Sequence, residues 1–168
     1  RVWHQPAGSV VASSSWLVRF RRSYPVGALG LREGLLAAES PDIRARLAAT
    51  VEIDDLVGLN YLPGKCGAVA VLGATGTNLI TIRERITQWD ADRVHGQKLD
   101  YEEVSRAVGW MCDMDDAGRA AIVGIEPGRE KTLHIGCLIL ERFLFALRAG
   151  VCTVSARGWR HALLERGT

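Results

Sequence analysis

A short segment rich in glycine and threonine is the part of this sequence best suited to chemistry. Its residues are Gly73, Ala74, Thr75, Gly76 and Thr77. Glycines let a backbone approach an anion closely, and the positive end of a helix beginning here would attract negative charge. The segment favours a phosphate-binding loop, and a tight turn that holds no ligand is an equal alternative.

An apolar strand and a helix must position this loop. Residues 68–72 form a short apolar run without alternation, which is typical of a strand covered on both faces of a sheet. Apolar residues recur at helical spacing from Leu79 onward, so we expect a helix there, capped by Thr75, Thr77 or Asn78. The loop would then lie at the carboxyl end of the strand, where open α/β sheets place ligands.

The composition is that of an ordinary globular domain. The chain has 168 residues, of which 48% are hydrophobic and 24% charged, and its net charge of +2 does not argue for nucleic-acid binding. No apolar run reaches the roughly 18 residues of a membrane span, and no signal peptide is visible. The cysteines lack metal-ligand spacing, so we expect a cytoplasmic protein with buried, reduced thiols at Cys66, Cys112, Cys137 and Cys152.

A hairpin and two helices are predicted ahead of the loop. Residues 10–12 and 16–21 have the composition of strands joined by a serine turn. Helices are expected from Leu29 onward and after Asp42, the second with apolar residues at Ile43, Leu47 and Val51. Four arginines in this half are either contacts for a polyanion or part of a solvated basic face. They are Arg19, Arg21, Arg22 and Arg32.

Two helices and a strand are predicted after the loop. Asp100 and Glu103 form a capping-box-like start for an amphipathic helix. A long helix over residues 130–149 is apolar on nearly all sides, holds His134 as a satisfied core histidine and ends at Gly150, before a strand at 151–155. Three carboxylates between the helices favour a solvated helix end over a divalent-cation site, because the glycine and glutamate of a calcium loop are missing. They are Asp113, Asp115 and Asp116.

Several short motifs occur in a fixed order along the chain. They include Tyr24-Pro25-Val26-Gly27, Leu72–Thr77, His95-Gly96, Gly124-Ile125 with Pro127-Gly128-Arg129, Gly136, and Val154-Ser155. In this order they resemble the Ppx/GppA family of exopolyphosphatases and guanosine pentaphosphate phosphohydrolases. The resemblance extends over nearly the whole chain and corresponds to the second of the family's two actin-like domains.

The resemblance implies a fold, a reaction and partners. It implies one α/β domain over residues 1–168, actin-like or ribonuclease H-like, with a mixed sheet and helices on both faces. The family removes the terminal phosphate of polyphosphate or guanosine pentaphosphate with Mg²⁺. In that setting Gly73–Thr77 would bind phosphate or nucleotide, the first actin-like domain would be a missing partner, and a homodimer is possible.

The sequence departs from the family where a second phosphate hairpin is expected. That hairpin should fall at residues 2–9, but its aspartate, glycines and glutamate are absent, and Pro6 removes an amide donor. Residues 1–8 are therefore a degenerate hairpin or a disordered lead-in. No catalytic residue and no metal ligand can be named in the chain. We expect it to be inactive in isolation, with a non-catalytic module that binds polyphosphate or nucleotide as the alternative.

Overall fold

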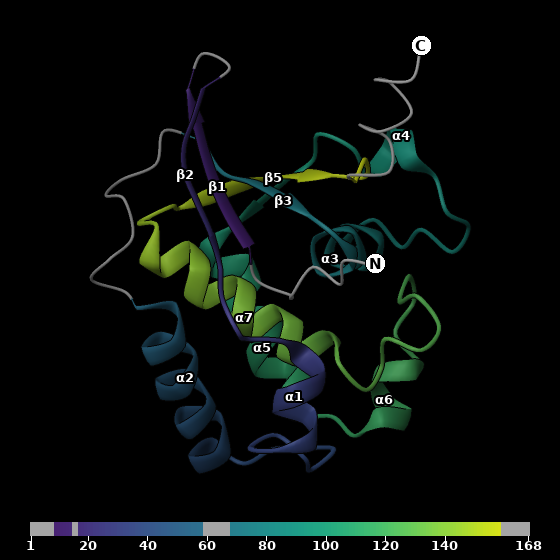
Figure 1. Ribbon diagram of the computed structural model, residues 1–168. Coiled ribbons are helices and arrows are strands. Elements are labelled where there is room, and N and C mark those ends of the chain that lie inside the picture. Colours follow the sequence, from purple (N-terminus) through teal and green to yellow (C-terminus); the bar gives the residue numbers. More distant parts are fainter. Residues whose placement is uncertain (1–8, 15–16, 59–67, 159–168) are drawn as a thin grey trace, which may run out of the picture.

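Strands and helices alternate along the chain, and the predicted mixed α/β fold is confirmed (Figure 1). The computed structural model describes residues 9–14, 17–58 and 68–158. The strands are β1 (Ser9–Ser14), β2 (Leu17–Ser23), β3 (Ala70–Leu72), β4 (Lys98–Asp100) and β5 (Val151–Ser155). The helices are α1 (Ala28–Glu33), α2 (Ile43–Val57), α3 (Ala74–Arg83), α4 (Ala91–Val94), α5 (Tyr101–Cys112), α6 (Asp116–Ala120) and α7 (Leu133–Ala146).

The strands form two sheets. The predicted hairpin is confirmed: β1 and β2 pair antiparallel, with Ser9 opposite Ser23. The other sheet has the order β3-β5-β4, in which β3 is parallel and β4 antiparallel to β5. Strand β4 was not predicted, because a strand of three residues is too short to show alternation.

In the described part of the chain, helices cover one face of the three-stranded sheet. Leu99, Cys152 and Val154 are buried on that face, above α5 and α7 (Figure 1). On the other face, Leu72 is 58% exposed and Val151 is 48% exposed. Helical coverage of this second face stays a prediction, because residues 159–168 lie outside the described part of the chain. The apolar run that ends in β3 reflects one buried face and one apolar face that no described helix covers.

Helix α7 forms the centre of the core, as its composition predicts. Most of its apolar residues are buried, Phe145 being the exception at 52% exposed, and the helix contacts α1, α2, α3 and α5. It ends earlier than expected: Arg148 adopts a left-handed conformation with φ of 51°, and the amide of Ala149 donates to the carbonyl of Leu144 at 2.9 Å. This turn completes the helix before Gly150, so the predicted glycine terminus is wrong.

Helix α2 packs with a different face from the one its larger residues predict. Ala49, Ile53 and Val57 are buried, whereas the side chains of Ile43, Leu47 and Val51 are more than half exposed. An ion pair fixes this orientation, since Arg142 of α7 donates to the two carboxylate oxygens of Asp54 at 2.6 and 2.8 Å.

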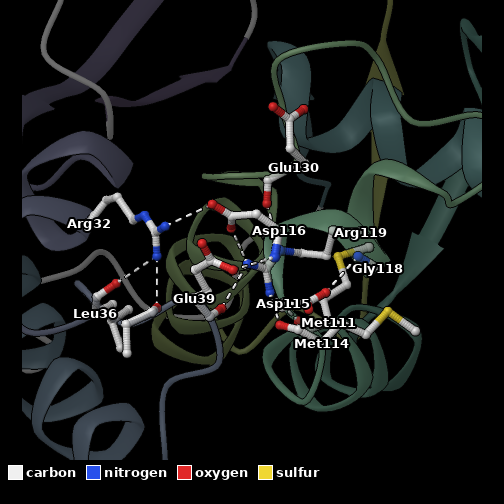
Figure 2. A network of polar contacts seen from close by, with 11 residues as sticks. Arg32, Leu36, Glu39, Met111, Met114, Asp115, Asp116, Gly118, Arg119 and Glu130 are labelled. Carbon is white, nitrogen blue, oxygen red and sulfur yellow. Dashed lines mark hydrogen bonds and ion pairs between the residues drawn. The ribbon is translucent and has the colours of Figure 1, made fainter.

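A fully buried arginine joins several segments below the sheet (Figure 2). Arg119 of α6 donates to the carboxylate of Asp116 at 2.5 Å, and the other oxygen of Asp116 accepts from Arg32 at 2.9 Å. The remaining donors of Arg119 reach backbone carbonyls that come from the end of α5, the segment before α2 and the segment before α7. These carbonyls belong to Met111, Met114, Glu39 and Glu130.

Replacing Arg119 tests how much this network contributes to stability. We expect Arg119→Met to lower the free energy of unfolding by about 3–5 kcal/mol, because Asp116 and four carbonyls lose their donor in a buried site. Urea denaturation measures the change. The control is Arg106→Met, which removes an arginine that is 67% exposed and 3.9 Å from Glu102, and which should change stability by less than about 0.5 kcal/mol. Equal effects of the two substitutions would contradict the role of Arg119.

Acid should destabilise the protein through His134, which is buried at the start of α7. Neither ring nitrogen has a hydrogen-bond partner among the described residues, so the expected satisfied histidine is buried but unsatisfied. Burial, followed by the charges of Arg119 and Arg32, lowers the pKa of His134 from 6.5 to about 4. The unfolded chain therefore takes up this proton at higher pH than the folded chain.

Above about pH 6.5 His134 is neutral in both states, and the free energy of unfolding is not reduced by this group. As the pH falls from 6.5 toward 4, protonation of His134 in the unfolded chain lowers the free energy of unfolding by about 3 kcal/mol. We expect His134→Leu to flatten the dependence of unfolding free energy on pH within this window. Urea denaturation at intervals from pH 7 to pH 4 measures the slope. A variant with the same slope as the wild type would show that other groups cause the acid sensitivity.

Candidate phosphate site

The predicted loop is the first turn of a helix. Gly73, with φ of 107°, directly precedes α3, and Ala74 is the first helical residue. No side chain caps the helix, so the expected cap by Thr75, Thr77 or Asn78 is wrong. Small residues allow α3 to begin directly after β3. A Cβ added to Gly76 would lie 3.1 Å from the Val71 side chain, which leaves no space for a larger residue beside β3.

The threonine hydroxyls of this turn lie against the protein. A Cβ added to Gly136 of α7 would lie only 2.5 Å from Thr75 Oγ1, so Thr75 packs directly on the α7 backbone. Thr77 Oγ1 lies 3.2 Å from the carbonyl oxygen of Ala74 and 3.4 Å from that of Gly73. These positions place both hydroxyls in contacts within the fold, so a ligand at this end of α3 would meet backbone groups.

Backbone amides are the donors that remain. The first hydrogen bond of the α3 ladder runs from the amide of Thr77 to the carbonyl of Gly73 at 3.5 Å. The amides of Ala74, Thr75 and Gly76 precede it and have no intrahelical acceptor. No acidic residue lies in the first turn, and Gly73 is exposed. This arrangement suits an anion placed at the helix end.

Two polar side chains hold α3 against the turn at residues 124–128. Asn78 Oδ1 accepts from the amide of Glu126 at 2.8 Å, and Asn78 Nδ2 donates to the Glu126 carboxylate at 3.1 Å. Thr81 Oγ1 donates to the carbonyl of Gly124 at 2.6 Å. A Cβ on Gly124 would lie 2.2 Å from the Thr81 carbonyl oxygen, so this position requires glycine. The sequence shows the glycine and proline of this turn but not its contact with α3.

The predicted basic contacts differ in their surroundings. The Arg32 guanidinium is engaged by Asp116 and by the carbonyl of Ala38 at 2.7 Å, so its role is internal. Arg22 is exposed, and its guanidinium carbon lies 5.1 Å from the ring centroid of Tyr24. Arg19 and Arg21 belong to β2, and their side chains lie outside the described residues. Polyanion binding by Arg19, Arg21 and Arg22 stays a prediction.

The carboxylates after α5 have structural roles. Asp115 caps α6 by accepting from the amide of Gly118 at 2.7 Å, and Asp113 lies 3.3 Å from Arg46. Asp116 is mostly buried between Arg32 and Arg119, so the expected solvated position is wrong for this residue. Among the described residues, no three His, Cys, Asp or Glu side chains form a group that could hold a metal ion. Binding of Mg²⁺ together with a phosphate ligand stays a prediction, since Mg²⁺ in proteins is usually held by one or two carboxylates and substrate phosphates.

The described cysteines are free and buried, as predicted. They are Cys112, Cys137 and Cys152, whereas Cys66 lies outside the described residues. Burial raises the pKa of the Cys152 thiol to about 11, which keeps it protonated at neutral pH. Within the described ranges, none of the helices combines the length and the apolar character needed to cross a bilayer.

Solved structures match this fold over nearly the whole chain. A Ppx/GppA family member from Aquifex aeolicus superposes with a TM-score of 0.87 and 22% sequence identity, over 97% of this chain and 54% of that protein. This chain has the fold of about half of a Ppx/GppA protein. An exopolyphosphatase from Cytophaga hutchinsonii matches with a TM-score of 0.76 and 15% identity, over 95% of this chain and 54% of that one.

A third structure, of an exopolyphosphatase-like protein, matches with a TM-score of 0.77 and 18% identity, over 89% of this chain and 51% of that one. No protein-family model matches the sequence, and no curated protein sequence matches it. Residues 1–8, the expected degenerate hairpin, lie outside the described part. The structure therefore shows a fold shared with Ppx/GppA proteins, at sequence identities too low to transfer an activity.

The contact between Thr75 and Gly136 predicts an interaction between two substitutions. Gly136→Ala should lower the free energy of unfolding by about 1–3 kcal/mol, because the added methyl group overlaps the Thr75 hydroxyl. Thr75→Ala removes that hydroxyl and leaves the Thr75 Cβ 3.5 Å away, an ordinary contact distance. The double variant should therefore be more stable than Gly136→Ala alone, as measured by urea denaturation. Additive losses would place the Thr75 side chain away from α7.

Proposed function

We propose that this chain is the phosphate-binding half of a Ppx/GppA-type phosphoanhydride phosphatase and is inactive as an isolated chain. The observation behind this proposal is the start of α3, where backbone amides without intrahelical acceptors follow β3 in a fold shared with solved Ppx/GppA proteins. A terminal phosphate of polyphosphate or of guanosine pentaphosphate is the proposed ligand. It would accept hydrogen bonds from the amides of residues 74–76.

Binding without hydrolysis follows from the chemistry of the surroundings. Phosphoryl transfer to water requires a group that orients the water and positive charge that stabilises the transferred group. Glu126 is a carboxylate that lies beside α3, where it is bound by Asn78 and lies 3.3 Å from Arg129. We assign no step to Glu126 or to a divalent ion. The chain spans about half the length of the solved proteins it matches, so hydrolysis would need a second domain.

A partner surface belongs to the same proposal. The uncovered face of the three-stranded sheet presents Leu72 and Val151 to solvent, and exposed apolar side chains on one sheet face are typical of an interface. We propose that a first actin-like domain, or a second copy of the chain in a homodimer, covers this face. Light scattering of concentrated protein would show association, and Leu72→Lys should reduce it.

The second candidate function is a regulatory module that binds polyphosphate or nucleotide without taking part in hydrolysis. It is favoured by the inward position of the Thr75 and Thr77 hydroxyls, which leaves donors for binding but no side chain for chemistry at this end of α3. Addition of a complete first domain from a Ppx/GppA protein separates the two functions. Release of inorganic phosphate from polyphosphate would favour the enzyme half, and binding without release would favour the module.

A carboxylate at the start of α3 tests the phosphate site. We expect Ala74→Asp to weaken binding of tripolyphosphate by roughly tenfold or more, because the new charge would lie among the amides that receive the phosphate. The same substitution should leave the melting temperature unchanged or raise it, since a carboxylate in the first turn favours a helix. Calorimetry measures binding, and thermal unfolding monitored by circular dichroism measures stability.

The control for this experiment is Ala48→Asp, which lies at an exposed position of α2 and changes the net charge of the protein by the same amount as Ala74→Asp. It should leave tripolyphosphate binding within about twofold of the wild type, because an exposed charge far from the site is screened by salt. Equal weakening by both substitutions would mean that tripolyphosphate binds to the protein surface through overall charge. Unchanged binding in Ala74→Asp would remove the start of α3 from the proposal.

A further inference from the structure

A cavity lies at the opposite end of α3 from the proposed phosphate site. Figure 1 shows how the chain turns there from α3 into α4. The volume of the cavity is about 560 Å³, and it is a mostly polar hollow that is open to solvent. The residues of interest in its lining are Arg85, Trp89, Asp90 and Arg93. Helix α3 has ten residues, so the two ends are separated by about 15 Å and the cavity is distinct from the proposed phosphate site.

The cavity combines an exposed aromatic ring with two cationic side chains. Trp89 is 61% exposed, which leaves its indole accessible to a flat ligand. The guanidinium groups of Arg85 and Arg93 have no hydrogen-bond or ion-pair partner among residues 9–14, 17–58 and 68–158. Arginines elsewhere in the described fold, such as Arg119 and Arg142, are engaged by carboxylates.

The carboxylate beside these arginines is occupied. Asp90 Oδ1 accepts from the amides of Asp92 and Arg93 at 3.1 and 3.3 Å, and thereby caps α4. Its role is to fix the turn that presents Trp89 and Arg93. Since Asp90 keeps its negative charge beside Arg85 and Arg93, the lining residues leave one net positive charge to attract an anion.

Arg85 occupies a backbone position that usually belongs to glycine. Its φ is 52°, and the flanking hydrogen bonds run from the Arg85 amide to Ile82 at 3.1 Å and from the Ile86 amide to Thr81 at 2.8 Å. This is the left-handed residue that ends a helix, and a side chain there is strained. Glycine would relieve the strain, whereas arginine adds a cationic side chain to the residues that line the cavity.

We infer that this cavity binds a mononucleotide, with the base stacked on Trp89 and the phosphate held by Arg85 and Arg93. A base presents a flat π face to the indole, and this contact tolerates different bases. A nucleoside monophosphate carries close to two negative charges at neutral pH, which two guanidinium groups can match with hydrogen bonds. Both parts of the ligand are needed, because phosphate alone makes no use of Trp89 and a nucleoside alone makes no use of the arginines.

Calorimetry with AMP, adenosine and inorganic phosphate tests this inference. The measurements use the Ala74→Asp background, which keeps binding at the start of α3 from contributing. We expect AMP to bind at least tenfold more tightly than adenosine or inorganic phosphate. Trp89→Ala and Arg93→Gln should each weaken AMP binding by roughly tenfold, through loss of stacking and of a charge-assisted hydrogen bond respectively. Trp110→Ala, at a partly exposed tryptophan of α5, should leave AMP binding unchanged.

Arg85→Gly separates a binding role from a structural one, because the two roles predict effects of opposite sign. We expect this variant to have a melting temperature a few degrees higher than the parent, as strain at the left-handed residue is relieved, and roughly tenfold weaker AMP binding. The matched control is Arg148→Gly, which relieves the same conformation at the end of α7, outside this cavity. It should raise the melting temperature and leave AMP binding unchanged.

The outcomes that would overturn the inference are defined by the same titrations. Absence of AMP binding at millimolar concentration would do so, as would AMP binding that Trp89→Ala leaves unchanged. Equal affinity for AMP and inorganic phosphate would reduce the cavity to a simple anion contact and overturn the nucleotide assignment. Failure of tripolyphosphate binding at the start of α3 would leave these results unaffected, because AMP and the substitutions at Arg85, Trp89 and Arg93 test the cavity alone.

Discussion

The buried guanidinium of Arg119 is the interaction on which the lower half of the structure depends. An arginine has five N–H donors in a fixed plane and stays charged, so in a site without water its donors need acceptors. Asp116 and the carbonyls from three neighbouring segments supply them (Figure 2). Because these acceptors point at one group, the end of α5, the segment before α2 and the start of α7 have one mutual arrangement.

This arrangement reaches the proposed phosphate site through α7. The carbonyl of Glu130, just before α7, accepts from Arg119 at 2.6 Å, which fixes where the helix begins. Gly136 then lies opposite Thr75, and the absence of a side chain at Gly136 lets α3 approach the α7 backbone. The direction of the α3 amides is thus set by packing between two helices. In the same network Arg32 and Asp116 bind each other, so their side chains are engaged within the fold.

The two ends of α3 have different chemistry. The start has backbone donors without a side-chain cap, and a ligand there would be recognised by charge and shape alone. The far end has arginines and an exposed indole, which would recognise a flat ring together with an anion. A helix of ten residues thereby connects the proposed phosphate site with the proposed mononucleotide site. The start is held against α7 through Thr75, and the far end is closed by the hydrogen bond from the Ile86 amide to the carbonyl of Thr81 in α3 itself.

Local signals in the sequence determined the features that involve neighbouring residues. The serine turn predicted the β1–β2 hairpin, Asp100 and Glu103 predicted the start of α5, and the apolar run around Leu138 predicted a buried α7. Each of these depends on residues a few positions apart, so composition and spacing were sufficient. The small residues after β3 likewise predicted a tight connection from strand to helix, although the helix begins earlier than the sequence indicated.

Only the tertiary structure decided where the functional side chains point. Arg32 and Asp116 are 84 residues apart, and nothing near either one shows that they pair. The inward position of Thr75 depends on the missing side chain of Gly136, and the exposed position of Leu47 depends on the pair between Asp54 and Arg142. Close packing leaves each of these side chains one arrangement, and that arrangement is set by partners distant in the sequence.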